Sequence, residues 1–336
     1  MEHTDSMLRV VYGDVVAGVH GNGFDYLFSY QTGGLESLVI RGREWLYRTP
    51  GPVFWRAVTD NDRGNHFPFR SAMWMGADQF TEKEKVEIWQ DGQPVEDFLA
   101  PGNSRFEKEV ICKEICFRFT CRTATVPQTR VRVSYTVDGS GRIRTEVHYE
   151  GKEGLPQLPV FGLRFVMPSV ASGYVYKGLS GETYPDRMAG GVKGCHEIQG
   201  LPVTPYLVPQ DCGMHMETEE LSVIREWNGE KMALRFTMEE APFAFTCLPY
   251  TALELEQATH QEELPPPRRT VVCILGAVRG VGGIDSWGSD VEPEAQISGE
   301  KDITYSFSIS PVKRDDDGRD QVGHNPCAEG ADQDDP

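Results

Sequence analysis

The sequence contains no long apolar run and no excess of positive charge. Over 336 residues no stretch approaches the about eighteen apolar residues of a membrane span, and residues 1–9 lack the basic and apolar regions of a secretory signal. The formal net charge of −18 disfavours binding to nucleic acid or to anionic membranes, because both require neutralisation of phosphate. We therefore expect no nucleic acid and no membrane among its partners, and we expect a cytoplasmic protein.

Several motifs of catalytic and metal sites are also missing. The eight cysteines are scattered and form no staple pattern of a secreted domain. His196, His215 and His260 stand far apart without metal-binding spacing, and there is no Gly-x-Ser-x-Gly elbow. The sequence thus predicts no metal bound by this chain and no hydrolase triad.

Alternation of apolar and polar residues with a period of two dominates the sequence. It recurs at residues 115–121, 131–137, 143–149, 232–238 and 303–309, and the Asp138-Gly139-Ser140-Gly141 cluster predicts a turn between two of these runs. Helical patterns are brief, at residues 81–89 and 252–259, which disfavours a βαβ architecture. We predict an all-β fold, a large antiparallel sandwich with a few short helices.

The predicted sandwich occupies residues 8–312. Residues 1–7 are polar and are predicted to be a flexible N-terminus. Residues 313–336 hold eight acidic residues and almost no aliphatic ones, so we predict a disordered acidic tail.

Residues 54–65 form the densest polar cluster of the chain. They combine an aromatic pair with an arginine, two carboxylates and a carboxamide, namely Arg56, Asp60, Asn61 and Asp62. One interpretation is a self-bonded loop in which Arg56 pairs with an acid. The other is a binding site, although the acids lack the ligand spacing of a calcium loop.

Two further clusters could contact a ligand. Residues 279–288 are rich in glycine and end in Asp285, Ser286, Trp287 and Gly288, and an indole on a glycine-shaped loop is suited to stacking on a sugar ring. Trp287 could equally cap the hydrophobic core. Residues 182–187 place Glu182, Tyr184 and Arg187 around a proline turn, which is either an ion-paired corner or part of a site.

Taken in order, these clusters resemble the C-terminal domain of glycoside hydrolase family 2 β-galactosidases and the free-standing small subunit of split enzymes. Residues 54–62 are similar to the family's Phe-Trp-Arg-Ala-Pro-Thr-Asp-Asn-Asp, with Val58 in place of the proline. Residues 181–187, 209–213, 258–265 and 279–288 resemble four further family motifs in the expected order. The resemblance covers nearly the whole of the predicted sandwich.

The resemblance implies a subunit that completes the pocket of a separate (β/α)₈-barrel β-galactosidase. It implies a mutarotase-like supersandwich fold, a galactoside substrate such as lactose, and a sugar-stacking role for Trp287 beside Asp285 and Ser286. Arg56, Asp60, Asn61, Asp62, Glu182, Tyr184 and Arg187 would form a site or interface loop. The catalytic carboxyl groups of a retaining enzyme, about 5 Å apart, and the magnesium would belong to the barrel partner, so the isolated chain would be inactive and would bind no cofactor.

Two alternatives remain open. The chain could be an independent carbohydrate-binding or mutarotase-like protein, with acid–base work at His196, His215, His260 or Glu182. It could also be a scaffold for assembly that never contacts substrate.

Overall fold

The computed structural model describes residues 7–100 and 110–311. The predictions of a flexible N-terminus and of an acidic tail at residues 313–336 concern segments outside these residues, apart from Met7. Within the described residues no helix is long and apolar enough to cross a membrane.

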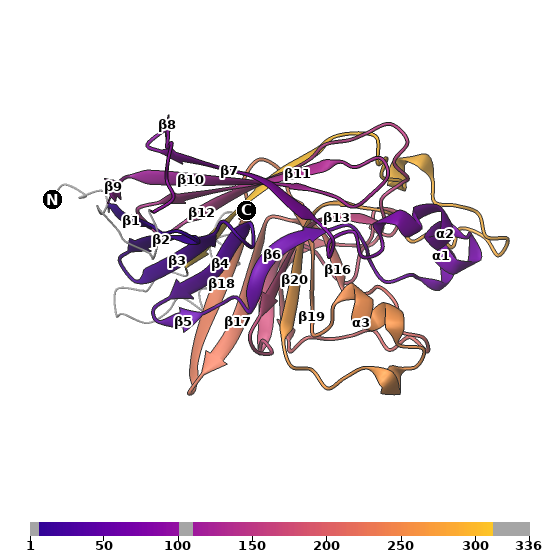
Figure 1. Cartoon of the computed structure of the whole chain (residues 1–336). Helices are drawn as coiled ribbons and strands as arrows, with labels where there is room; N and C mark the ends of the chain where they lie inside the picture. Colours follow the sequence, from indigo (N-terminus) through magenta and orange to yellow (C-terminus); the bar gives the residue numbers. More distant parts are fainter. Residues whose placement is uncertain (1–6, 101–109, 312–336) are drawn as a thin grey trace, which may run out of the picture.

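The strands form three antiparallel sheets (Figure 1). The six-stranded sheet has the order β5-β4-β3-β2-β1-β9. Its strands are β1 (Leu8–Tyr12), β2 (Val16–Gly21), β3 (Phe24–Ser29), β4 (Gly34–Ile40), β5 (Arg43–Glu44) and β9 (Val110–Cys112). The five-stranded sheet has the order β16-β19-β20-β13-β6. Its strands are β6 (Arg48–Val53), β13 (Val160–Met167), β16 (Met214–Thr218), β19 (Phe243–Leu248) and β20 (Thr270–Val278).

The largest sheet has ten strands in the order β15-β14-β17-β18-β21-β12-β11-β10-β7-β8. These are β7 (Glu82–Gln90), β8 (Gln93–Pro94), β10 (Glu114–Arg122), β11 (Arg130–Asp138), β12 (Ile143–Tyr149), β14 (Gly173–Leu179), β15 (Lys193–Gln199), β17 (Glu220–Trp227), β18 (Glu230–Met238) and β21 (Ile303–Pro311).

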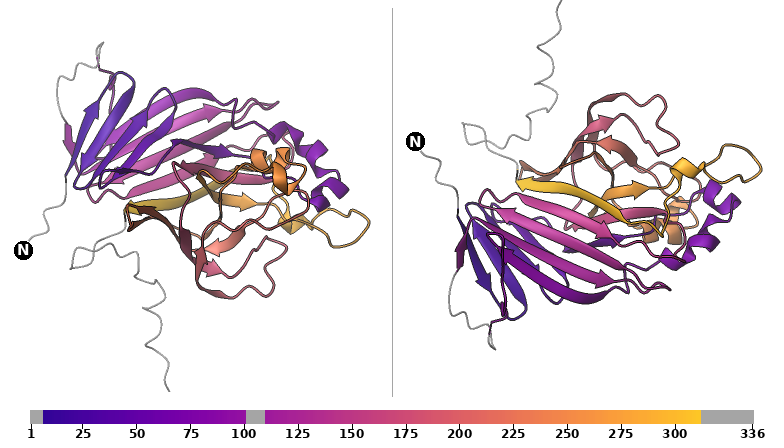
Figure 2. Two further views of the ribbon diagram at one scale, coloured as in Figure 1. Left: turned by 90° about the horizontal axis from the view of Figure 1, so that it is seen from below. Right: turned by 90° about the horizontal axis from the view of Figure 1, so that it is seen from above.

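Both smaller sheets pack on one face of the ten-stranded sheet (Figure 2). Phe28 of the six-stranded sheet stacks on Phe117 of β10 with ring centroids 4.2 Å apart, and Phe165 of the five-stranded sheet meets Phe236 of β18 at 5.2 Å. Phe117 and Phe236 point to the same side, because the strand registers between them keep the same parity. One continuous apolar core therefore lies between the large sheet and the two smaller ones.

The alternating runs form strands as predicted, and the predicted antiparallel sandwich with few helices is confirmed. The turn after β11 closes where the N–H of Gly141 donates to the carbonyl of Asp138 at 2.9 Å, with Gly141 at a φ of 83°. A left-handed φ of this kind favours glycine, which is why the cluster ends the strand.

The helix predicted at residues 81–89 is wrong, because this segment is strand β7. Its alternating charges lie near the sheet edge, where they form cross-strand ion pairs: Arg130 Nε is 2.6 Å from Glu84, and Arg122 pairs with Glu82. Ile88 points into the core. Cross-strand charge pairing and one buried aliphatic face outweigh the helical propensity of Glu and Lys.

Three short helices lie at one end of the sandwich (Figure 1). Helix α3 (Ala252–Gln257) matches the prediction at residues 252–259 and begins at a capping box between Thr251 and Glu254. Helices α1 (Asp60–Gly64) and α2 (Phe67–Ser71) were not predicted; each has only five residues. The turn Ala72–Trp74 and the segments Gln261–Glu263 and Pro293–Ala295 are 3₁₀ helices.

Candidate functional site

The residues of helix α1 lie against the loop that carries Trp287. Thr59 caps the helix: the N–H of Asp62 donates to its hydroxyl at 3.2 Å, while the Asp62 carboxylate accepts the N–H of Thr59 at 3.1 Å. This is a capping box with aspartate in the third position. The box fixes the Asp62 carboxylate in the interior, where only 3% of the side chain is exposed.

A chain of alternating charges runs from this carboxylate to the surface. We call it the charge chain; its members are Arg56, Asp62, Arg279, Asp290 and Arg70. Arg56 is 2.8 Å and Arg279 3.3 Å from the two oxygens of Asp62, and Arg279 also pairs with Asp290. Asp290 then pairs with Arg70 of α2 at 2.7 Å. Burial lowers the pKa of Arg279, and the carboxylates of Asp290 and Asp62 oppose that shift.

Residues 279–290, the Trp287 loop, are held at their base by the other polar clusters. The carboxylate of Asp186 accepts the backbone N–H groups of Val281 at 3.0 Å and Gly282 at 2.7 Å. Asn61 donates from Nδ2 to the carbonyl of Val281 at 3.0 Å, and Arg187 donates to the carbonyl of Gly282. The clusters at residues 54–65 and 182–187 are therefore two sides of one mount for the loop.

Two glycines of the loop make close approaches to α1 that no larger residue would permit. Gly283 has a φ of +75°, and a Cβ there would lie 2.6 Å from Nδ2 of Asn61. Gly288 has a φ of +81°, and a Cβ there would lie 2.9 Å from the carbonyl oxygen of Gly64. Both the backbone conformation and the contact distance require glycine at these positions.

The tip of the loop presents Trp287 to solvent. Its side chain is 92% exposed, so it does not cap the core. Asp285 shapes the tip from within: one carboxylate oxygen accepts the N–H of Trp287 at 2.9 Å, and the other accepts the hydroxyl of Ser289 at 2.5 Å. These hydrogen bonds from Ser289 and from the Trp287 backbone lower the pKa of Asp285. Ser286 is exposed beside the ring.

A second buried pair lies behind the charge chain. The hydroxyl of Tyr184 donates to Asp211 at 2.9 Å, and both side chains are buried next to Arg56. Burial raises the pKa of Asp211 to about 7, against the opposing charge of Arg56. Burial likewise raises the pKa of Tyr184 well above its usual value, and the charge of Asp211 adds to that shift.

The remaining sequence motifs, at residues 209–213 and around α3, lie at the same end of the sandwich. Gln210 forms a two-way amide contact with Asp60, accepting its N–H at 2.9 Å. Glu182 accepts the N–H of Gly213 at 2.9 Å, and Glu256 of α3 accepts the N–H of Val58 at 2.7 Å. Segments far apart in the chain thus converge on one loop mount.

Comparison with known proteins assigns this arrangement to a family. The chain matches the family described as β-galactosidase small chain over residues 20–309. The chain belongs to the β-galactosidase small-chain family. The β-galactosidase small subunit of Latilactobacillus sakei is 56% identical over 317 residues, which cover 92% of this chain and 100% of that protein.

This small chain also matches longer proteins and more distant structures. A β-galactosidase of Halalkalibacterium halodurans is 33% identical over 91% of this chain, but the match spans only 28% of that protein. A galactose mutarotase-like protein from Lactobacillus casei has a TM-score of 0.41 at 8% identity, covering 88% of this chain and 99% of that structure. The resemblance to a β-galactosidase small subunit, drawn from the five motifs, is confirmed.

The structure brings the predicted site residues of the small chain together, in unequal roles. Arg56 and Asp62 are buried ion partners, whereas the side chain of Asp60 is 72% exposed and pairs with Arg63. Asn61 and Arg187 bond the loop backbone. Glu182 and Tyr184 hold the turns behind the loop, and Trp287 is the large side chain that the mount exposes.

Sequence reasoning missed several members of the mount. Arg70, Arg279 and Asp290 complete the charge chain, and Asp186 binds the loop backbone, although none was named as a site residue. The Thr59-x-x-Asp62 spacing before α1 was an available signal for the helix. The pairing of Asp62 with Arg279 joins residues 217 positions apart, which no local pattern reveals.

The histidines of the mutarotase-like alternative do not form one site in the small chain. His215 is buried, with Nε2 3.0 Å from the Tyr174 hydroxyl and Nδ1 2.8 Å from the carbonyl of Gly181, and burial lowers its pKa to about 4. His196 packs on Tyr176, whose ring also contacts His215. His260 instead contacts Thr259 and Glu263 after α3. A neutral imidazole with both nitrogens engaged is poorly placed for acid–base work.

Proposed function

We propose that this small chain is a subunit of a heteromeric β-galactosidase that completes the substrate pocket of a separate catalytic subunit. The enzyme would hydrolyse terminal β-D-galactosides such as lactose, and the family would be glycoside hydrolase family 2. The observation that carries the proposal is the 92% exposure of Trp287 on a loop with an elaborate internal mount.

The mount supports a positioned binding surface. An exposed indole contributes no buried apolar surface to the stability of its own chain. A loop that holds such a side chain in solvent is therefore typical of a binding surface. The apolar face of a pyranose ring matches the π-surface of an indole, and the indole N–H can meet a hydroxyl group. Because the Asp285 carboxylate accepts hydrogen bonds from the loop backbone, we assign Asp285 to shaping the tip of the loop. Ser286 would lie beside the sugar.

The surroundings of Trp287 support docking of a partner. Phe69 of α2 is 82% exposed and Ile284 of the loop 50% exposed, and α2 is joined to the loop through the ion pair of Arg70 with Asp290. Exposed apolar side chains grouped near a site are typical of a protein interface. Asp60, Asn61 and Arg63 at the exposed side of α1 would line the edge of that interface.

Catalysis would reside in the partner. A retaining galactosidase uses two carboxyl groups about 5 Å apart on a (β/α)₈ barrel, and this chain is built of antiparallel sheets. Magnesium would bind in the barrel as well. We propose the cytoplasm as the compartment, from the sequence, and cell fractionation tests it.

The experiment is co-expression of this chain with a β-galactosidase large subunit, followed by kinetics on lactose and a nitrophenyl galactoside. Trp287→Ala in the intact complex should raise KM and reduce kcat/KM by about five- to 150-fold, because a stacking contact of about 1 to 3 kcal/mol is lost. Trp287→Phe should retain part of the effect. Phe80→Ala, which removes another exposed ring outside the mount, is the matched control.

The outcomes separate three roles. Failure of the two subunits to associate, or association without gain of hydrolysis, contradicts the subunit role. Unchanged kinetics of Trp287→Ala in an intact complex makes the chain a scaffold. Binding or anomerisation of galactose by the small chain alone favours the independent sugar-binding function.

A further inference from the structure

A second concave region lies on the five-stranded sheet, and its lining shares no residue with the mount. It is a cavity of about 590 Å³ between β6, β13, the start of β20, α3 and the segments that flank α3. Four arginines line it, Arg48, Arg164, Arg268 and Arg269, against a single carboxylate, Glu254. Such an excess of positive charge is unexpected in a chain with a net charge of −18. We call this the arginine cavity.

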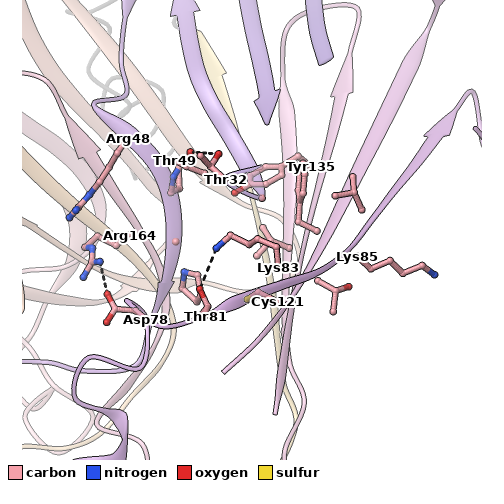
Figure 3. Close-up of a pocket in the computed structure, with 18 of the residues that line it drawn as sticks. Thr32, Arg48, Thr49, Asp78, Thr81, Lys83, Lys85, Cys121, Tyr135 and Arg164 are labelled. Carbon is pink, nitrogen blue, oxygen red and sulfur yellow. Dashed lines mark hydrogen bonds and ion pairs between the residues drawn. The ribbon is translucent and has the colours of Figure 1, made fainter. Parts of the chain in front are cut away.

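The arginines converge because of the strand register. Arg48 of edge strand β6 is opposite Val166 of β13, Arg164 lies two residues before that position, and Arg269 directly precedes β20 beside β13. Figure 3 shows Arg48 and Arg164 on the same side of β6, with Asp78 next to Arg164. A smaller cavity of about 220 Å³ shares Arg48, Gln79 and Arg164 as lining residues.

The positive charges of the cavity are only partly compensated. Among the described residues, Arg164 is the one arginine of the four with a carboxylate at ion-pair distance, Asp78 at 2.6 Å. Glu254 is committed to the cap of α3, where it accepts the N–H of Thr251 at 2.7 Å. Burial and the like charges of Arg164 and Arg269 lower the pKa of Arg48, although the carboxylates of Asp78 and Glu254 oppose that shift. The cavity therefore holds guanidinium groups close together without enough acid of its own.

Specific contacts hold the walls of the cavity in place. The guanidinium of Arg269 lies 3.3 Å from the centroid of the Tyr47 ring, which fixes its direction. The hydroxyl of Tyr250 donates to the carbonyl of Pro265 at 2.9 Å and holds the proline segment as one wall. Val166, Leu253, Val271 and Pro266 supply apolar surface between the charged groups.

We propose that the arginine cavity binds a small organic anion, a molecule that carries two or more carboxylate or phosphate groups on a compact carbon body. Guanidinium forks match the oxygens of both groups in bidentate fashion. The apolar and proline walls would contact the carbon body, and the volume lies in the range of small-molecule sites. This inference is independent of Trp287 and of galactosidase activity.

The test is calorimetric titration of the full chain with citrate, fructose 1,6-bisphosphate, inorganic pyrophosphate and galactose at low salt. Citrate or the bisphosphate should bind once per chain and more tightly than pyrophosphate, because the carbon body contributes. The double variant R48Q/R269Q should weaken that binding by about ten-fold or more. R122Q/R130Q removes the same charge from β10 and β11, where the two side chains are 40% and 49% exposed, and should change that affinity less than about two-fold.

Several results would overturn the proposal. An equal loss of anion affinity in the two double variants would indicate diffuse electrostatic attraction. An equal affinity for galactose would show that the anionic groups are not recognised. Tighter binding of pyrophosphate than of either organic probe excludes the carbon body. If R48Q/R269Q weakens assembly with the catalytic subunit but none of the anions binds, the arginines instead meet acidic groups of that protein.

A fold control keeps the test decisive. The melting temperature of R48Q/R269Q should match that of the unmodified chain. If this variant does not fold, R48K/R269K takes its place, because it preserves both charges but loses the guanidinium forks. Its affinity for citrate or the bisphosphate should be measurable but lower than that of the unmodified chain. Full retention of affinity in R48K/R269K contradicts bidentate recognition.

Discussion

The two arginine-rich regions of the molecule differ in how their charge is balanced. In the charge chain, Arg56 and Arg279 are buried against Asp62 and Asp290, and each charge has a partner of opposite sign. In the arginine cavity, Arg48 and Arg269 face other arginines across an open space. Balanced buried charge builds a rigid mount, whereas unbalanced, accessible charge is typical of a place that receives a ligand.

The largest expected effect comes from opening the charge chain. Asp62→Ala leaves Arg56 and Arg279 buried without their shared carboxylate and removes the cap of α1. We expect the free energy of unfolding to fall by about 3–5 kcal/mol in urea denaturation, as for other broken buried pairs. Asp60→Ala, on the exposed side of α1, should cost less than about 1 kcal/mol. An equal loss of unfolding free energy in the two variants would show that the charge chain does not stabilise the fold.

An effect that is smaller for each unit of pH is expected at Asp211. Burial raises its pKa to about 7, so the folded chain holds a proton that the unfolded chain releases above its ordinary pKa. Stability from this group is therefore present at low pH and is lost as the pH rises towards 7, with a slope of at most about 1.4 kcal/mol per unit.

Asp211→Asn should remove this slope. The measurement is the difference in unfolding free energy between the variant and the unmodified chain at several pH values from about 4 to 8. The variant should gain relative stability as the pH rises through this window. A difference that is constant with pH would show that Asp211 is charged throughout, held so by Arg56.

The smallest effect is expected in the arginine cavity. Arg48→Gln removes a charge that faces Arg164 and Arg269, so the free energy of unfolding should change by less than about 0.5 kcal/mol or rise slightly. Thermal melting at low salt checks this result. A loss comparable to that of Asp62→Ala would place Arg48 among the structural ion pairs and remove the contrast between the two regions.

Much of the fold followed from local pattern. The period-two runs that became β10, β11, β12, β18 and β21 place their alternating apolar residues in the core, so alternation identified them. β7 was wrongly predicted as a helix because it is rich in Glu and Lys, which favour helices. In the structure these charged residues pair across strands, a tertiary effect that the local sequence does not show. Helices α1 and α2 are too short to show periodicity and depend on capping and packing instead.

The site was predictable only in part. Resemblance singled out Trp287 and the clusters around it, and the structure joins them in one mount. Arg279, Asp290 and Arg70 were missed because their partners lie more than 200 residues away along the chain or at the far end of the loop. The arginine cavity was also missed, since Arg48, Arg164 and Arg269 belong to three separate segments that only sheet pairing brings together.

The most direct test of the proposed role of Trp287 is a structure of the complex between this chain and its catalytic subunit with a galactoside bound. We predict the indole at the mouth of the barrel, with its face against the apolar face of the sugar ring. A complex in which Trp287 remains in solvent, or packs against protein away from the sugar, would contradict the account.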